Sequence, residues 1–282
     1  MEKVLVIGAS GQVGMASMKV FSKDFKVVGT YYKNKKNNLV RLDITDKNET
    51  SKLIEKEKPD IVLLLSGNIS IDFCEDNPEE AKKINVEGTR NVVDSIIGAK
   101  LVFLSTEYVF DGKNGPYSET DNPHPINVYG KTKLDAEKIV QKSKNHLIVR
   151  STLIFSLGYD EKNLLHIIVK SLKQGKKIEV VDDQLTCPIS ADNLAEALAD
   201  LIRKDSKGIY NVAGPQRMSR FEFAIRAAKA LEMDYSLIKP VKTSEFRKKA
   251  KRPLSAGLIV DKFKKISKIR LLGVEDSVKK FS

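Results

Sequence analysis

The sequence of 282 residues contains no tryptophan, two cysteines, three histidines and no long apolar run. A helix that crosses a bilayer needs roughly 20 consecutive apolar residues, so we expect no membrane partner. Cys74 and Cys187 lie far apart in the chain and predict two reduced thiols, which excludes a disulfide scaffold and a thiolate metal cluster. His124, His146 and His166 lack the spacing of metal ligands, and we predict no metal site.

The start of the chain shows no pattern of a secretory leader. An apolar strand begins at residue 3, which leaves no room for a signal peptide. A hydrophobic content of 41% and a charged content of 30% are typical of a soluble globular protein. The sequence therefore predicts a cytoplasmic location.

The net charge of +12 is concentrated toward the carboxyl end. Residues 239–282 contain 14 Lys/Arg and 4 Asp/Glu. Such a segment indicates a solvated lysine-rich surface, a surface that steers an anionic substrate, or a contact with nucleic acid. Since no RNA- or DNA-binding motif accompanies it, we expect no nucleic-acid partner, and the other two interpretations stay open.

The amino-terminal segment has the pattern of a dinucleotide-binding turn. An apolar strand is followed at once by Gly8, Gly11 and Gly14, and then by a helical pattern that runs to about Phe21. Glycines at these positions let the backbone approach a pyrophosphate, and the helix N-terminus supplies N–H donors. The contacts predicted from this turn are Gly8, Ser10, Gly11, Gln12 and Val13.

Tyr129 and Lys133 stand four residues apart, so a helix places them on one face. An ammonium beside a phenol favours the phenolate, and we predict that Lys133 lowers the pKa of Tyr129. A tyrosine of this kind can exchange a proton near neutral pH. Thr106 follows an apolar strand upstream, where its hydroxyl can hydrogen-bond a substrate carbonyl.

Near-continuous apolar strands alternate with helical patterns along the chain. Strands are predicted over 3–8, 26–31, 60–65, 100–105, 146–151 and 208–213, with a further strand-like segment at 177–181. Helices are predicted over 12–23, 47–57, 78–97, 129–143, 163–174, 191–203 and 219–232. This alternation predicts an α/β fold of the Rossmann type, with a doubly wound parallel sheet covered on both faces.

Together these motifs resemble the extended short-chain dehydrogenase/reductase family, and within it the dTDP-4-dehydrorhamnose reductase branch. That branch shares its fold with the regulatory (beta) subunit of methionine adenosyltransferase. The strings that carry the resemblance are residues 8–14, 43–45, 105–112, 127–133, 150–152 and 252–255. The resemblance implies a cofactor-binding Rossmann domain at 1–153 plus about 190–214. It also implies a smaller, discontinuous substrate-binding domain at about 154–189 plus 215–282.

The segment after the second predicted strand indicates the cofactor. A site for NAD carries Asp or Glu there to bond the adenine ribose, whereas this chain has Tyr31 and Lys33 and no carboxylate. A cation accepts a 2′-phosphate that a carboxylate would repel, so we predict NADP(H), with NAD(H) as the alternative. By the resemblance, further cofactor contacts are Asp43 and Ile44 at the adenine and Ser66, Gly67 and Asn68 beside the pyrophosphate and ribose.

The resemblance implies NADPH-dependent reduction of the 4-keto group of a nucleotide-linked 6-deoxyhexose. In this reaction Tyr129 is the general acid, Lys133 holds the nicotinamide ribose, and Thr106 orients the carbonyl. The partner is a nucleotide-diphosphate sugar, and its expected contacts besides Thr106 are Glu107, Leu153, Gln184 and Arg252. Arg150 either neutralises a diphosphate or is a buried structural arginine.

Two strings in the predicted substrate pocket differ from the branch. Its R-T-S-W reads Arg-Ser-Thr-Leu at 150–153, and its Y-G-x-P-T reads Leu-Thr-Cys-Pro-Ile at 185–189. Both leave Thr106, Tyr129 and Lys133 intact. They keep two alternatives open, namely a non-catalytic NADP-binding regulatory subunit of the methionine adenosyltransferase type, and another epimerase or reductase of the extended family. A homodimer also stays open.

Overall fold

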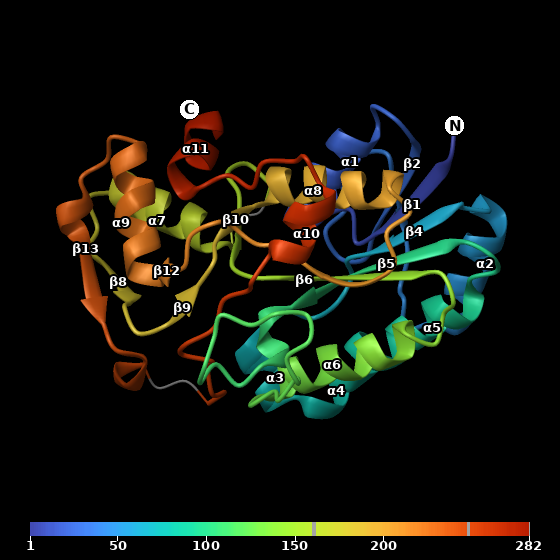
Figure 1. Ribbon diagram of the computed structural model, residues 1–282, viewed down its shortest axis with the longest axis horizontal. Coiled ribbons are helices and arrows are strands. Elements are labelled where there is room, and N and C mark those ends of the chain that lie inside the picture. Colours follow the sequence, from blue (N-terminus) through green and yellow to red (C-terminus); the bar gives the residue numbers. More distant parts are fainter. Residues whose placement is uncertain (160–161, 247–248, 282) are drawn as a thin grey trace.

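The structure is a computed structural model that describes residues 1–159, 162–246 and 249–281 (Figure 1). Within that part of the chain, seven parallel strands form the central sheet in the order β11-β6-β5-β4-β1-β2-β3. These strands are β1 (Lys3–Ile7), β2 (Lys26–Tyr31), β3 (Leu39–Arg41), β4 (Ile61–Leu64), β5 (Lys100–Thr106), β6 (His146–Ser151) and β11 (Gly208–Asn211). The predicted Rossmann-type fold is confirmed, and β3 is a strand that the sequence patterns did not predict.

Helices cover both faces of this sheet because its strands are apolar on both sides (Figure 1). Val4 and Val6 of β1 face a core that includes Phe21 and Leu198, whereas Leu5 of the same strand belongs to the core on the opposite face. The first face is covered by α1 (Gln12–Phe21) and α8 (Ala191–Arg203), and the second by α2 (Lys47–Glu57), α5 (Gly88–Ser95) and α6 (Val128–Val140).

The helix predicted over 78–97 is divided in the structure. It consists of α4 (Pro78–Lys82), a π-helical turn (Lys83–Glu87) and α5, and α3 (Ile71–Asp76) precedes it. Single π-helical turns inside helices are frequent at functional sites. The side chains of the Lys83–Glu87 turn are therefore candidates for a functional role.

A second hydrophobic core lies beside the sheet, around Phe155, Leu165 and Phe223. It is enclosed by α7 (Leu164–Lys173), α9 (Arg220–Ala230) and α11 (Val274–Val278), and by β8 (Ile178–Val181) paired in parallel with β13 (Ile238–Val241). These elements gather at the left of Figure 1. They join segments far apart in sequence, as the predicted discontinuous domain requires, while its boundaries stay a prediction.

Two short strand pairs are β7 (Ile154–Phe155) with β10 (Ile189–Ser190) and β9 (Leu185–Thr186) with β12 (Met218–Ser219). The short helix α10 (Asp261–Ile266) packs through Phe263 on the core of the central sheet. Single 3₁₀ turns span Glu107–Val109, Tyr235–Leu237, Thr243–Glu245 and Lys279–Phe281. The described residues contain no helix long and apolar enough to cross a membrane.

Candidate functional site

The glycine turn after β1 lies against the segment that follows β4. Gly8 has a φ of +93°, and a Cβ atom there would stand 2.9 Å from the backbone nitrogen of Ser66. A Cβ at Gly14 would overlap the carbonyl oxygen of Gly8. The backbone N–H of Gly8 donates to the hydroxyl of Thr30 at 3.1 Å. Side chains are therefore excluded at Gly8 and Gly14, as a backbone cradle for phosphates requires.

Other residues of the turn use their side chains for packing within the protein. The amide of Gln12 donates to the carbonyl of Ile154 at 3.2 Å and accepts from the hydroxyl of Ser156 at 3.0 Å. Val13 is buried in the core, whereas Ser10 is half-buried and Gly11 is exposed. At the start of a helix the first N–H groups have no intrahelical acceptor, so the turn can offer its backbone to an anion.

Asn85, on the π-helical turn, holds the segment after β4 in place. Its side-chain oxygen accepts from the N–H of Asn68 at 2.7 Å, and its side-chain nitrogen donates to the carbonyl of Asn68 at 3.0 Å. The same nitrogen lies 3.0 Å from the hydroxyl of Thr132 on α6. The buried amide therefore ties the predicted pyrophosphate segment, Ser66 to Asn68, to the helix of Tyr129. The sequence contained Asn85 in a helical string but gave no sign of this role.

The end of β2 carries the predicted adenosine contacts. Tyr31 is half-buried and Lys33 is exposed, with its ammonium 5.5 Å from the centre of the Tyr32 ring. The guanidinium carbon of Arg41, on β3, lies 5.7 Å from the same ring and was missed because β3 was not predicted. Two cations therefore meet one aromatic ring at the position where a 2′-phosphate is expected.

Asp43 and Ile44 follow β3. Burial alone would raise the pKa of the Asp43 carboxyl, but hydrogen bonds from the N–H and hydroxyl of Thr45 outweigh it and lower the pKa. Ile44 is buried, and its side chain occupies the place that a Cβ at Gly88 would take. An ionised Asp43 beside an apolar isoleucine suits a ribose or adenine contact, which stays a prediction.

The three predicted catalytic residues gather at the carboxyl end of β5. Thr106 is its last residue, and Tyr129 and Lys133 stand one turn apart on α6. All three are buried. The hydroxyl of Thr106 accepts from the backbone N–H of Tyr108 at 3.2 Å. The amide of Asn127 caps α6 by accepting from the N–H of Gly130 at 2.8 Å, which sets where this helix begins.

The prediction that Lys133 lowers the pKa of Tyr129 is wrong for this structure. Burial raises the pKa of Tyr129, and the interaction of its phenol with the Thr106 side chain only partly opposes that shift. The ammonium of Lys133 instead donates to the carbonyl of Leu104 at 2.8 Å and lies 3.9 Å from the centre of the Phe103 ring. The spacing of four residues places Tyr129 and Lys133 on one face of α6, but it does not determine the direction of the Lys133 ammonium.

Burial lowers the pKa of Lys133 to about 7, although the nearby Glu137 carboxylate opposes the shift. The ordinary pKa of a lysine is 10.5, so between pH 7 and pH 10.5 Lys133 binds more protons in the unfolded chain than in the folded protein. The free energy of unfolding is therefore expected to increase as pH rises from about 7 to 10.5. Lys133→Met is expected to remove that part of the slope.

Urea unfolding of both proteins at several pH values measures this difference. Far-ultraviolet circular dichroism is the suitable signal, since the chain has no tryptophan. Equal slopes in the wild type and Lys133→Met would contradict the lowered pKa.

Glu107, predicted to contact the sugar, is buried and used within the protein. Its carboxylate accepts from the hydroxyl of Thr186 at 2.7 Å and from the N–H of Gly257 at 2.9 Å. Burial raises the pKa of this carboxyl, and these hydrogen bonds oppose the shift. Glu107 thus connects the end of β5 to β9 and to the segment at Gly257. Its contact with substrate stays a prediction.

Arg150 is a buried structural arginine in this structure. Its guanidinium donates to the Glu137 carboxylate through Nε at 3.0 Å and Nη2 at 2.7 Å, and both side chains are almost fully buried. Ser105 donates to the same carboxylate. The pair, with Ser105, thus joins β5, β6 and α6.

The remaining predicted substrate residues come from three segments. Gln184 donates to the hydroxyl of Thr243 at 2.9 Å, and the guanidinium of Arg252 lies 2.9 Å from the Asp72 carboxylate. Leu153 is half-buried against the second core. Among the described residues, no three His, Cys, Asp or Glu side chains could hold a metal together, and Cys74 and Cys187 are both buried and reduced.

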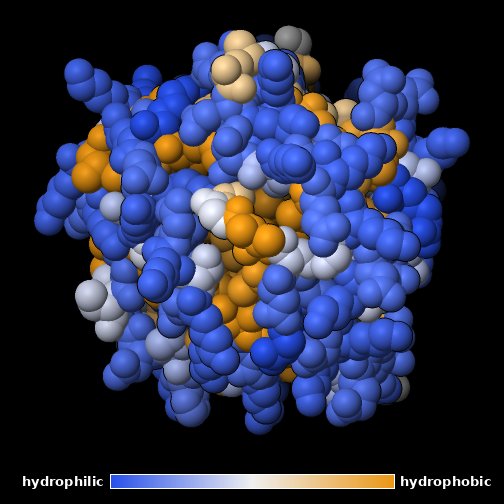
Figure 2. All heavy atoms as spheres, turned by 90° about the vertical axis from the view of Figure 1, so that its right-hand side faces the viewer, coloured by the Kyte–Doolittle hydropathy of each residue, from blue (hydrophilic) through white to orange (hydrophobic). Residues whose placement is uncertain are grey.

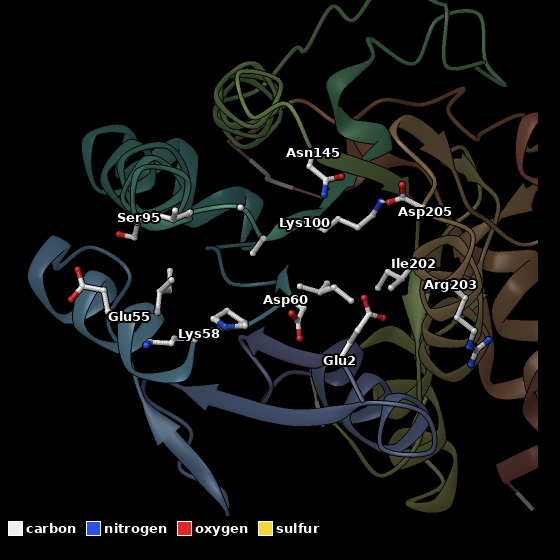
Figure 3. Close-up of a pocket in the computed structure, with 16 residues that line it drawn as sticks. Glu2, Glu55, Lys58, Asp60, Ser95, Lys100, Asn145, Ile202, Arg203 and Asp205 are labelled. Atoms are coloured by element: carbon white, nitrogen blue, oxygen red, sulfur yellow. Dashed lines mark hydrogen bonds and ion pairs between the residues drawn. The ribbon is translucent and has the colours of Figure 1, made fainter.

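A hollow of about 810 Å³ lies at the opposite end of the sheet, where β4 and β5 begin (Figure 3). Figure 2, turned to face this side, shows a hydrophobic floor among hydrophilic side chains. The side chains of Lys100 and Asp205 meet there as an ion pair of 2.7 Å. Since Lys100 begins β5 and Thr106 ends it, the hollow is separate from the candidate site.

Comparisons with known proteins found a matching family model and similar relatives. A family model described as the RmlD substrate binding domain matches residues 1–282. A dTDP-4-dehydrorhamnose reductase from Sinorhizobium fredii (strain NBRC 101917 / NGR234) is 28% identical over 99% of this chain and 96% of that protein. The methionine adenosyltransferase 2 subunit beta of Pongo abelii is also 28% identical, over 96% of this chain and 83% of that protein.

Solved structures are also similar over nearly their whole length. The crystal structure of a dTDP-4-dehydrorhamnose reductase from Bacillus anthracis str. Ames in complex with NADP has a TM-score of 0.90 and 28% identity. The similarity covers 99% of this chain and 98% of that one.

Proposed function

The chain belongs to the RmlD substrate binding domain family, and from that membership we propose that it is a reductase of nucleotide-linked 4-keto-6-deoxyhexoses that uses NADPH. The observation that carries this proposal is that Thr106, Tyr129 and Lys133, all buried, gather at the carboxyl end of β5. In doubly wound sheets, ligands bind at this edge. The reductases of Sinorhizobium and Bacillus support the same type of reaction.

The residues around the glycine turn fit a dinucleotide. Gly8 and Gly14 leave no space for a side chain, so a pyrophosphate can approach the backbone N–H groups at the start of α1. Asn85 holds the Ser66–Asn68 segment beside this turn. Lys33 supplies positive charge where the 2′-phosphate of NADP would lie, and Arg41, which is paired with Glu49, lies near the same Tyr32 ring. When bound, the cofactor supplies the hydride.

The protein side chains position the ketone and move a proton. Thr106 orients the carbonyl oxygen, and Tyr129 donates its proton to that oxygen as negative charge develops there. Because burial raises the pKa of Tyr129, its phenol stays protonated near neutral pH, which is the form that a general acid needs. Lys133, one turn away on α6, is proposed to hold the nicotinamide ribose.

The cofactor preference can be tested at Lys33. The substitution Lys33→Glu places a carboxylate beside Arg41 and opposite the expected 2′-phosphate, so the affinity for NADPH is expected to fall on the order of tenfold. The affinity for NADH should change little or improve. Binding titrations measure both, and Lys19→Glu, an exposed charge reversal at the end of α1, is the matched control. An equal loss for both cofactors would contradict a role at the 2′-phosphate.

The activity itself is tested by the loss of NADPH absorbance with dTDP-4-keto-6-deoxy-L-mannose. We expect turnover with NADPH that exceeds turnover with NADH. Binding of NADPH without oxidation, on this and other nucleotide-linked keto-sugars, would reject the reductase proposal.

A second candidate is a regulatory subunit that binds NADP without turnover. It is favoured by the methionine adenosyltransferase 2 subunit beta, whose identity to this chain equals that of the Sinorhizobium reductase. It predicts NADP binding, no keto-sugar reduction, and a stable complex with a methionine adenosyltransferase catalytic subunit. An epimerase of the extended family would instead keep its cofactor through purification.

A further inference from the structure

Arg220 lies at the candidate site and was not predicted from the sequence. It is the first residue of α9, its side chain is half-buried, and its Nη2 lies 3.4 Å from the hydroxyl of Tyr108. Its backbone N–H donates to the carbonyl of Gln184 at 3.2 Å. The arginine therefore stands where the second core meets the end of β5.

Arg220 differs from the other described arginines in its partners. An ion pair with a carboxylate is formed by Arg41, Arg90, Arg150, Arg203, Arg226, Arg252 and Arg270. Arg217 is exposed and donates to the hydroxyl of Ser255 and the carbonyl of Ala256. Within the described part of the chain, the Arg220 guanidinium makes one hydrogen bond, to a phenol.

The groups near Arg220 do not neutralise its charge. Tyr108 is buried, and burial raises the pKa of its phenol, so that the phenol is uncharged. The charge of Arg220 also has a small electrostatic effect on the Glu107 carboxyl. Glu107 instead accepts hydrogen bonds from Thr186 and Gly257, and it forms no ion pair with Arg220. A half-buried cation has lost part of its hydration, and an anion that enters the site would restore favourable interactions.

The position of this charge matches the expected substrate. The Tyr108 ring packs edge to face on the Tyr129 ring, with centres 5.7 Å apart. Arg220 is therefore about one aromatic ring away from the proposed general acid. In a nucleotide-linked hexose, one sugar ring separates the keto carbon C4 from C1, which carries the diphosphate.

We propose that Arg220 binds the diphosphate of the nucleotide-linked sugar and thereby places C4 at Tyr129. This inference rests on the proposed function, since it names a residue of the same site. The charge of Arg252 also lowers the pKa of Tyr108, but Arg252 is already paired with Asp72. Arg220 therefore has the greater capacity to bind an anion.

The test is calorimetric titration of the full chain, saturated with NADP, with dTDP, UDP and thymidine. Arg220→Gln keeps a polar side chain without the charge, and Arg220→Lys keeps the charge without the planar fork. Lys229→Gln, an exposed position on α9, removes the same net charge and is the matched control. Circular dichroism verifies that each variant is folded.

We expect Arg220→Gln to weaken the preferred nucleoside diphosphate on the order of 10- to 100-fold. Arg220→Lys should lose less, and Lys229→Gln should bind like the wild type. Thymidine, which has no phosphate, should bind all four proteins equally. A diphosphate affinity that Arg220→Gln leaves unchanged, or a wild type that binds neither diphosphate, would overturn the inference. Because binding needs no turnover, failure here is distinguishable from failure of the reductase assay.

Discussion

Tyr129→Phe is expected to lower kcat for keto-sugar reduction on the order of 10²- to 10⁴-fold, the range that general acid catalysis contributes. Tyr129 is buried with Thr106 at the carboxyl end of β5, and phenylalanine has no hydroxyl proton to donate. Folding should persist, since Tyr129 packs in a small apolar cluster with Cys74, Ala81 and Tyr108. NADPH oxidation under saturating substrate measures the effect.

Tyr210→Phe is the matched control for this experiment. Tyr210 is a buried tyrosine of β11 whose ring lies under the Lys262 ammonium, and its loss of a hydroxyl should leave kcat unchanged. NADPH affinity should stay within a few-fold of the wild type in both variants. A Tyr129→Phe protein that retains most of its turnover would show that another group delivers the proton.

Glu137→Ala is expected to reduce the free energy of unfolding by about 3–5 kcal/mol. The change leaves the buried Arg150 guanidinium without its carboxylate and the Ser105 hydroxyl without its acceptor. A loss of this size is a large part of the roughly 5–15 kcal/mol that stabilises a typical domain. Urea unfolding followed by circular dichroism measures it.

Two further variants show whether the buried charge is the cause. Glu137→Leu with Arg150→Leu removes both charges, so the double variant should be more stable than Glu137→Ala. Glu49→Ala breaks the exposed pair with Arg41 and should cost less than about 1 kcal/mol. A Glu137→Ala protein as stable as Glu49→Ala would contradict the importance of the buried network.

Local sequence patterns predicted the fold and brought the residues of the candidate site to one edge of the sheet. Apolar strands that alternate with amphipathic helices specify a parallel sheet, and the strands of the central sheet appear within a residue or two of the expected ends, apart from β3. The string from Gly8 to Gly14 specified a turn in which Gly8 and Gly14 have no space for a side chain, because its spacing has a direct steric meaning. β3 was missed because three residues with two exposed positions carry almost no periodic signal.

The contacts of each site residue with distant segments could not be predicted from the sequence. The spacing of Tyr129 and Lys133 predicted a shared helix face, but the direction of the Lys133 ammonium depends on the Leu104 carbonyl and the Phe103 ring of a different element. The roles of Asn85 and Glu137 likewise come from contacts with distant segments.

By itself, the sequence determined the α/β architecture, the glycine cradle and the positions of Thr106, Tyr129 and Lys133, because those features depend on residue type and short-range spacing. Only the tertiary structure decided which charges are paired. It pairs Arg150 with Glu137 and leaves Arg220 against a phenol, although neither arginine has a distinguishing local pattern. The physical reason is that burial and electrostatic pairing are set by segments that meet only when the chain folds.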